Sequence, residues 1–102
     1  MTTNGKPGGG GEQAEGAFEI INERGLHARA ATKLVQTASR YGCEVVLFGP
    51  EADGVNGKSV MGVLLLCGAK GTTVRVQAHG PGAEDCVHAI GALIAQRFGE
   101  GE

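Results

Sequence analysis

Aromatic side chains and clustered positive charge are both scarce in this sequence. The 102 residues include no tryptophan, one tyrosine and three phenylalanines, and the nine lysines and arginines form no basic block. The formal net charge is −2. A nucleic-acid-binding surface needs a basic patch, usually with aromatic side chains on which bases stack. The composition therefore argues against a nucleic-acid partner.

Long hydrophobic runs are absent as well. The longest, residues 60–67, is interrupted by a glycine and is far shorter than the roughly 20 residues that a membrane-spanning helix needs. The first residues contain no apolar core of the kind found in a secretory signal peptide. We therefore expect no membrane insertion and a cytoplasmic location.

Cysteine is limited to three residues. The odd count, the wide spacing and the lack of a CxxC pair argue against a disulfide framework or a zinc site. Cys43, Cys67 and Cys86 each fall within a predicted strand or helix, so we expect buried packing residues. His79 and His88 lack a partner ligand at metal-binding spacing and are interpreted as surface or packing residues. The sequence predicts no metal site and no bound cofactor.

Glycine is abundant, with 19 residues, but six of them lie among the first 16. In that stretch only Met1 and Ala14 are apolar, and no strong periodicity is present. We interpret residues 1–16 as a flexible Gly-rich tail that acts as a spacer. Residues 17–102 are then one domain with a single modest core.

Hydrophobic periodicity divides the rest of the chain into seven elements. Apolar residues at 31, 34, 35, 38 and 41 have the spacing of an amphipathic helix. Alternation of Val74, Val76 and Ala78 with polar residues is typical of a half-buried strand. The order β-α-β-β-α-β-α indicates an α+β two-layer sandwich with the helices on one face. The predicted elements are strands at 17–21, 43–48 and 72–78, a short strand or turn at 53–58, and helices at 28–41, 59–67 and 83–98.

The most informative stretch is residues 25–32, GLHARAAT, at the start of the first helix. A helix N-terminus offers unpaired backbone N–H groups and a partial positive charge, which suits a phosphate. His27 can take a phosphoryl group on a ring nitrogen, and Arg29 can add charge-assisted hydrogen bonds. The alternative is a histidine near a helix cap beside a solvated arginine. The chemistry alone favours that plainer interpretation.

Residues 52–59, ADGVNGKS, match a loosened nucleotide-binding loop, with Ala52 in place of the first glycine of GxxxxGKS. Such a loop follows a buried strand of a parallel sheet and opens a long helix. This segment instead follows a proline-containing loop and precedes a short predicted helix, and no later strand ends in an aspartate suited to magnesium. We therefore reject nucleotide binding and expect Ser59 to cap the short helix.

Two motifs together resemble the HPr family, the histidine phosphocarriers of the bacterial phosphotransferase system. Residues 25–32 are similar to the family's active-site signature, and residues 56–62, NGKSVMG, are similar to its second signature, around a regulatory serine. The interval between the motifs also fits, and the resemblance covers residues 17–98. It implies the HPr fold, an open-faced sandwich of a four-stranded antiparallel sheet and three helices.

The resemblance implies a phosphoryl carrier that is not itself an enzyme. His27 would accept a phosphoryl group on Nδ1 from an Enzyme I-type donor and pass it to EIIA- or EIIB-type acceptors. Arg29 would screen charge during transfer, and the backbone N–H groups of Ala28 to Ala30 would hold the phosphate oxygens. Ser59 would be phosphorylated by a dedicated serine kinase. The chain is expected to act as a monomer, without metal or nucleotide.

A carrier that meets several partners needs a small, transient, fairly apolar patch. Val60, Met61 and Leu64 of the short helix are the candidates, with core packing as the alternative. We expect a mixture of the two roles, with Met61 the exposed contact.

Ala30 departs from the family pattern, which usually has proline after the arginine. Proline near a helix start fixes φ and lacks a donor that would be orphaned anyway. Alanine restores a free N–H and loosens the first turn, so the departure bears on transfer rate and partner preference.

The alternative to a carrier in sugar uptake is a regulatory module of the same fold. Its phosphorylation would act as a signal to partner proteins, as in the family's nitrogen-related branch.

Overall fold

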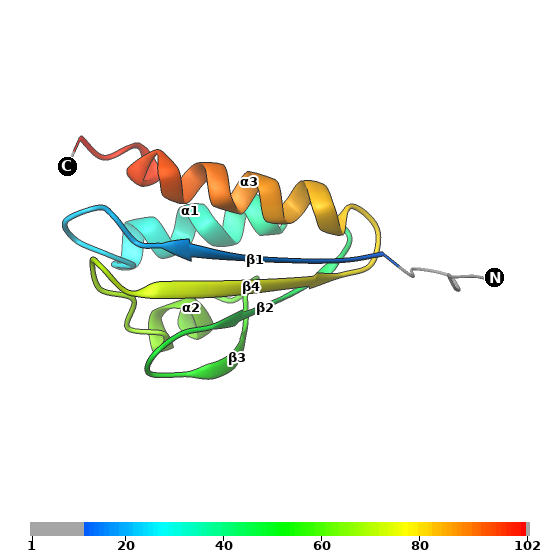
Figure 1. Ribbon diagram of the computed structural model, residues 1–102, viewed down its shortest axis with the longest axis horizontal. Helices are drawn as coiled ribbons and strands as arrows, with labels where there is room; N and C mark the ends of the chain where they lie inside the picture. Colours follow the sequence, from blue (N-terminus) through cyan, green and yellow to red (C-terminus); the bar gives the residue numbers. More distant parts are fainter. Residues whose placement is uncertain (1–11, 102) are drawn as a thin grey trace.

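The chain forms one antiparallel sheet with helices packed against it (Figure 1). The computed structural model describes residues 12–101. The predicted α+β class and the β-α-β-β-α-β-α order are confirmed. The elements are β1 (Gln13–Glu19), α1 (Ala28–Ala38), β2 (Glu44–Phe48), β3 (Asp53–Asn56), α2 (Val60–Leu65), β4 (Thr73–His79), α3 (Ala83–Ala95) and the short 3-10 helix η1 (Arg97–Gly99).

The strands lie in the order β1-β4-β2-β3, and each neighbouring pair is antiparallel. The central strand β4 places Val76 opposite Gly16 of β1 on one side and Leu47 of β2 on the other. Side chains alternate across a strand, so Val74, Val76 and Ala78 bury one face of β4 while the intervening residues stay outside the core. This face carries the helices.

The core lies between that face and the helices. Leu34 of α1, Val63 of α2 and Ile90 of α3 are fully buried there, as expected for helices that each present one apolar stripe to a sheet. Burial of a large aliphatic side chain contributes about 1.5–3 kcal/mol. Further buried members from the strands, from α3 and from the connecting segments are Ile20, Leu47, Leu66, Val74, Val76, Ile94 and Phe98.

The predicted boundary between tail and domain is wrong at β1. The strand begins at Gln13 and not at residue 17, and residues 13–16 pair with residues 76–79 of β4. Ala14 and Gly16 occupy the helix-facing positions of this part of the strand. They are too small to produce a hydrophobic alternation, which is why the sequence pattern missed them. Residues 1–11 of the predicted tail lie outside the described residues.

Both long helices end earlier than predicted. Helix α1 stops at Ala38 and not at residue 41, and a turn leads through Gly42 into β2. Helix α3 stops at Ala95, because Arg97 and Phe98 adopt positive φ values of 56° each. Phe98 is nevertheless fully buried. The apolar periodicity therefore identified Phe98 as a core residue but placed it in the wrong local conformation.

The three cysteines differ in environment. Cys43 and Cys86 are buried, as predicted. Burial, with the Cys43 thiol beside it, raises the pKa of the Cys86 thiol to about 12, so this group stays protonated and inert. The prediction for Cys67 is wrong. This residue follows α2 with a φ of 52°, in the left-handed conformation that commonly ends a helix, and it is exposed.

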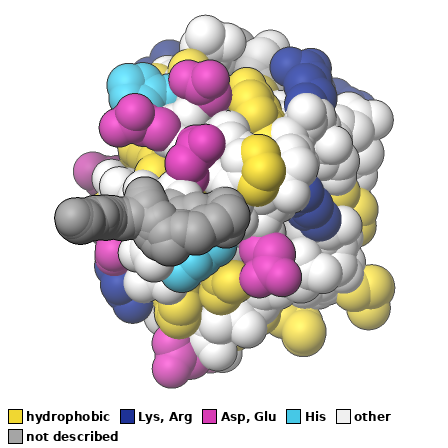
Figure 2. Space-filling view, turned by 90° about the vertical axis from the view of Figure 1, so that its right-hand side faces the viewer, with side chains coloured by type: hydrophobic (Ala, Val, Ile, Leu, Met, Phe, Trp, Pro, Cys, Tyr) yellow, Lys and Arg dark blue, Asp and Glu magenta, His cyan; other side chains and the backbone are white. Residues whose placement is uncertain are grey.

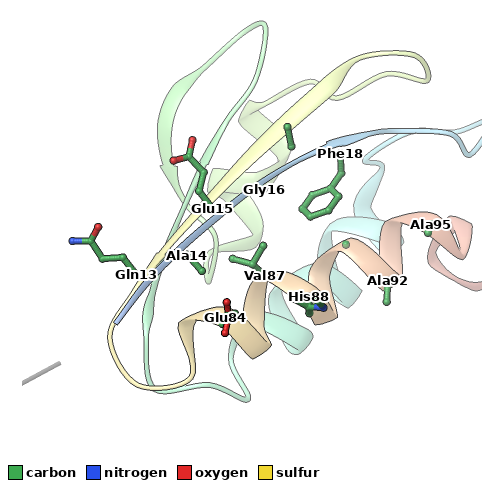
Figure 3. A pocket seen from close by; sticks show the side chains of 12 residues that line it. Gln13, Ala14, Glu15, Gly16, Phe18, Glu84, Val87, His88, Ala92 and Ala95 are labelled. Atoms are coloured by element: carbon green, nitrogen blue, oxygen red, sulfur yellow. The ribbon is translucent and has the colours of Figure 1, made fainter. Parts of the chain in front are cut away.

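A hollow of about 680 Å³ lies between β1 and α3 (Figure 3). Gly16 and Gly91 leave room for the Phe18 ring: a Cβ on Gly91 would lie 2.5 Å from that ring. His88 borders the hollow and is exposed, as His79 is in β4, so the surface assignment of both histidines is confirmed. Gly16 and Gly91 are therefore explained by the packing of the Phe18 ring between β1 and α3.

Figure 2 views the end of the molecule that carries the start of β1. Several acidic side chains lie close together there beside a histidine, while lysine and arginine side chains are scattered over the face. Within residues 12–101, none of the helices combines the length and the apolar character required to cross a bilayer.

Candidate functional site

His27 lies where two loops are held together. The Leu26 N–H donates to the Gly68 carbonyl oxygen at 2.8 Å, which joins the segment after β1 to the segment after α2. Gly25 has a φ of 63°, and a Cβ there would lie 2.3 Å from the same Gly68 oxygen. Only glycine fits that close approach. The glycine of the GLHAR motif therefore sets the position of the histidine that follows two residues later.

His27 is the N-cap of α1. Its backbone is extended (φ −73°, ψ 177°), and its carbonyl accepts the N–H of Ala31 at 2.8 Å. Its Nδ1 accepts the backbone N–H of Arg29 at 3.3 Å. Nδ1 thus faces the positive end of the helix dipole. The bond is long for an N–H donor, so the Arg29 N–H can be given up to a stronger acceptor.

The other ring nitrogen, Nε2, contacts the Glu100 carboxylate. The second oxygen of Glu100 accepts from Asn22 Nδ2 at 3.0 Å, and the same nitrogen donates to the Gly25 carbonyl at 3.0 Å. Asn22 is fully buried, while the His27 and Glu100 side chains are 24% and 16% exposed. Hydrogen bonds from His27 and then from Asn22 hold the pKa of the Glu100 carboxyl below its usual range. The group is a carboxylate near neutral pH.

Two arginines lie beside this histidine. Arg24 and Arg29 line a shallow hollow of about 230 Å³ together with Glu100. Arg24 and His27 line a second one of about 240 Å³ with the exposed Cys67. In the described range, neither guanidinium takes part in an ion pair. The structure therefore brings His27 and Arg29 together, as the motif predicts, with positive charge available for an anion.

Sequence reasoning missed Asn22, Arg24 and Glu100 as neighbours of His27. Asn22 is a buried polar residue three positions before the motif. Its closeness to the motif in sequence is the one signal that could have pointed to it. Its Oδ1 is buried with no hydrogen-bond partner among residues 12–101. Glu100 is 73 positions from His27, and no local pattern connects the two.

Ala28 and Ala30, whose backbone N–H groups are predicted to hold the phosphate, lie in the first turn of α1. Ala28 and Ala30 occupy its first and third positions, and the backbone N–H groups of a first turn have no partner within the helix. No backbone acceptor is found for the Ala30 N–H within the described range. Ala30 itself is fully buried. Its N–H is therefore the orphan donor that a proline would remove at no cost in hydrogen bonding.

We expect Ala30→Pro to raise the free energy of unfolding by about 0.4–1 kcal/mol, because proline restricts the unfolded chain at a φ that the helix already supplies. Phosphoryl acceptance should persist. Chemical denaturation measures the effect. Ala38→Pro, in the last turn of the same helix, is the control and should cost about 3 kcal/mol. A loss of stability for Ala30→Pro would show that the core around Ala30 has no room for the ring.

Ser59 is the N-cap of α2, and the predicted cap is confirmed. Its hydroxyl oxygen accepts the Gly62 N–H at 3.2 Å. A Cβ on Gly62 would lie 2.9 Å from the Asn56 carbonyl oxygen, so the turn of the NGKSVMG motif packs closely against the start of the helix. Ser59 is half-buried.

Helix α2 exposes two large apolar side chains. Met61 is 70% exposed, as predicted, and Leu65, which was not among the candidates, is 60% exposed. The two are four residues apart and so share one face of the helix. Val60 and Leu64 are half-buried against the core. Partner docking by Val60, Met61 and Leu64 remains a prediction, and the exposed face adds Leu65 to it.

Residues 52–59 do not form a nucleotide-binding loop. Half of the segment is strand β3, which pairs antiparallel with β2, and the helix that follows has six residues. Within residues 12–101, no three His, Cys, Asp or Glu side chains are grouped so that they could hold a metal ion.

Comparison with known proteins agrees with this arrangement. A family model described as "PTS HPr component phosphorylation site" matches residues 14–96. The chain belongs to the HPr family. The match includes both signatures and runs from β1 to the end of α3, so the resemblance seen in the two motifs extends over the sheet and its three helices.

Individual HPr proteins match over most of their length. The phosphocarrier protein HPr of Neisseria meningitidis is 44% identical over 86 residues, which cover 84% of this chain and 96% of that protein. The phosphocarrier protein HPr of Cupriavidus necator is 45% identical over 83 residues, with coverage of 81% and 92%. The crystal structure of HPr-C-His from Thermoanaerobacter tengcongensis superposes with a TM-score of 0.81 at 37% identity, covering 87% of this chain and 99% of that one. The chain is a phosphocarrier of the phosphotransferase system.

Proposed function

We propose that His27 is the residue on which this phosphocarrier holds the phosphoryl group, and that it reacts through Nδ1. The supporting observation is the capping geometry. Nδ1 faces the N-terminus of α1 and is bonded only weakly, to the Arg29 N–H at 3.3 Å. A lone pair in that position is available to attack phosphorus, and the group formed would lie at the positive end of the helix.

The transfer step moves one phosphoryl group between two nitrogens. The P–N bond of a phosphorylated Enzyme I-type donor breaks, and its electron pair stays with the donor nitrogen. The Nδ1 lone pair of His27 forms the new P–N bond. The Nε2 proton stays in place, so the ring gains positive charge. Transfer onward to an EIIA- or EIIB-type acceptor reverses these changes at His27, and no metal or nucleotide is needed by this chain.

Arg29 and the first turn of α1 supply the electrostatic stabilisation. Ala28 and Ala30 lie in the first turn of α1, where backbone N–H groups have no partner within the helix, and the Arg29 side chain is exposed. Donors fixed in advance at a site of developing charge lower the barrier without reorganisation. Exposure keeps the binding moderate, and a carrier has to release its group to the next partner.

The docking surface is the face of α2 that carries Met61 and Leu65, together with half-buried Val60 and Leu64. This helix ends just before Cys67, which borders the hollow beside His27. A partner seated on α2 therefore reaches the histidine. Such contacts suit a small, transient interface. We infer that the chain works as a monomer in the cytoplasm, where its donor and acceptors are.

Incubation of the full chain with phosphoenolpyruvate and an Enzyme I should give a phosphoprotein that is labile in acid and stable in base, with the label mapped to His27 by mass spectrometry. Chasing the labelled protein with sugar-specific EIIA or EIIB proteins, and separately with nitrogen-branch acceptors, distinguishes sugar uptake from regulation. A chain that stays unlabelled with several Enzyme I proteins would contradict the proposed donor. Label on another residue would contradict the site.

Ser59 is proposed as a site of regulatory phosphorylation. We expect Ser59→Asp to fold normally, because aspartate caps helices well, and to slow phosphorylation of His27. A negative charge beside Met61 would have to lose its hydration when a partner docks, and it would repel an acidic partner. Initial rates of labelling by Enzyme I measure the effect.

Ser59→Ala is the matched control for that experiment. It should lose a cap worth about 0.5–2 kcal/mol and still accept phosphate at the wild-type rate. Equal labelling rates for Ser59→Asp and wild type, with both proteins folded, would reduce Ser59 to a capping residue.

A further inference from the structure

We propose that Glu100 is a positioning residue for His27: it fixes the ring tautomer that carries the proton on Nε2 and so leaves Nδ1 as the nucleophile. The inference rests on the proposed transfer at His27. Glu100 lies beyond residue 96, where the family match ends, so its role is not part of what the family model describes.

The partners of the two ring nitrogens dictate the tautomer. The Arg29 backbone N–H is only a donor, so Nδ1 must present its lone pair. The Glu100 carboxylate is only an acceptor, so Nε2 must carry the proton. A neutral imidazole has one donor and one acceptor nitrogen, and this arrangement satisfies both. The opposite tautomer would place a donor against a donor and a lone pair against a carboxylate.

Glu100 is itself held from a second direction. Its other carboxylate oxygen accepts from Asn22 Nδ2, which is fully buried and also bonded to the Gly25 carbonyl at the start of the histidine motif. Two donors, one from Asn22 and one from His27, therefore face the two oxygens of one carboxylate. An amide in its place would offer one oxygen and would turn a donor toward a donor.

An uncommon backbone brings Glu100 to this position. Arg97, Phe98 and Gly99 have φ values of 56°, 56° and 77°, a run that non-glycine residues rarely adopt. The Phe98 side chain is fully buried, and its carbonyl accepts from Lys33 Nζ of α1 at 2.6 Å. These contacts reverse the chain after α3 and direct it back over the start of α1. Strained backbone held in this way by its surroundings is concentrated at functional sites.

The charge distribution suits a transfer step. When Nδ1 forms the P–N bond, the ring becomes positive and the carboxylate at Nε2 faces that charge directly. Arg24 and Arg29 line the hollow that contains Glu100. They offset the repulsion between the carboxylate and an incoming phosphoryl group on the opposite nitrogen.

Nitrogen-15 NMR of the His27 ring tests the proposal without any transfer reaction. In the wild-type chain above the histidine titration range, the Nε2–H tautomer should predominate, with well-separated shifts for protonated Nε2 and unprotonated Nδ1. In Glu100→Gln the two shifts should converge as the tautomers mix. Glu44→Gln, an exposed carboxylate at the start of β2, is the matched control and should leave both shifts unchanged. Mixed tautomers in the wild type, or unchanged shifts in Glu100→Gln, would overturn the proposal.

The second measurement is kinetic. Glu100→Gln should lower kcat for labelling by Enzyme I by about ten-fold, the low end of the loss seen when the carboxylate or carbonyl partner that orients a metal-bound histidine is removed, with little change in KM because α2 is intact. An unchanged kcat would also overturn the proposal. If the wild-type chain is not labelled at all, the proposed function fails, while the NMR result still decides whether Glu100 fixes the tautomer.

Discussion

Replacing His27 with alanine should abolish labelling by phosphoenolpyruvate and Enzyme I. The ring supplies the nucleophile at the start of α1, and neither charged neighbour can take its place: Arg29 is always protonated, and the Glu100 carboxylate faces Nε2 and not the helix end. Labelling followed by acid and base treatment measures the loss.

The alanine variant also loses the cap of α1, so a second variant separates chemistry from folding. His27→Asn keeps a good N-cap side chain and should be folded and equally unlabelled. His79→Ala and His88→Ala remove exposed histidines that lie outside the site, and both should be labelled as wild type is. Label retained in a folded His27→Asn protein would place the phosphoryl group elsewhere.

The second largest effect is expected for Arg29→Ala. The side chain is exposed and outside the apolar stripe of α1, so the fold should be unaffected. Loss of one donor fixed in advance at a developing charge costs about 2–4 kcal/mol of transition-state stabilisation, which corresponds to a rate lower by about 30- to 900-fold. Rapid-mix labelling at several Enzyme I concentrations should show the loss in kcat.

Arg40→Ala is the control for charge alone. Arg40 is exposed just after the far end of α1, so its removal changes the net charge by the same amount without touching the site. It should transfer at the wild-type rate. Wild-type transfer rates in both variants would make Arg29 a bystander. An equal loss of rate in both variants would assign the effect to long-range electrostatic attraction of the partner.

The parts of the site that are local in sequence could be predicted. The histidine, the arginine two residues later and the helix start all fall within residues 25–32, and capping chemistry places them together without reference to the rest of the chain. The cap at Ser59 could be predicted for the same reason, since serine is among the residues preferred at a helix N-cap. The helix-sheet order followed from periodicity, although each boundary depended on residues with weak signals.

The remaining parts depend on tertiary structure. Glu100 reaches His27 only because Phe98 is buried with a positive φ, and a pattern that counts apolar spacing assigns Phe98 to a continuing helix. Cys67 is exposed because α2 ends before it, and the apolar run through residue 67 gave no sign of that end. Gly16 lies in β1 without contributing an apolar side chain, because the Phe18 ring and Val87 of α3 occupy the space where its Cβ would be. That packing involves α3, so no pattern local to β1 shows it.

The two ends of the described chain lie at opposite ends of the molecule, and only one of them is near His27. The start of β1 lies at one end of the molecule, whereas the segment after α3 lies at the other, beside the start of α1 (Figure 1). A fluorescent protein, affinity handle or sensor surface joined ahead of β1 therefore stays clear of His27. The same attachment placed after residue 101 would sit next to Arg24 and Arg29 and obstruct incoming proteins. Interaction measurements on this carrier should be tethered from the β1 side.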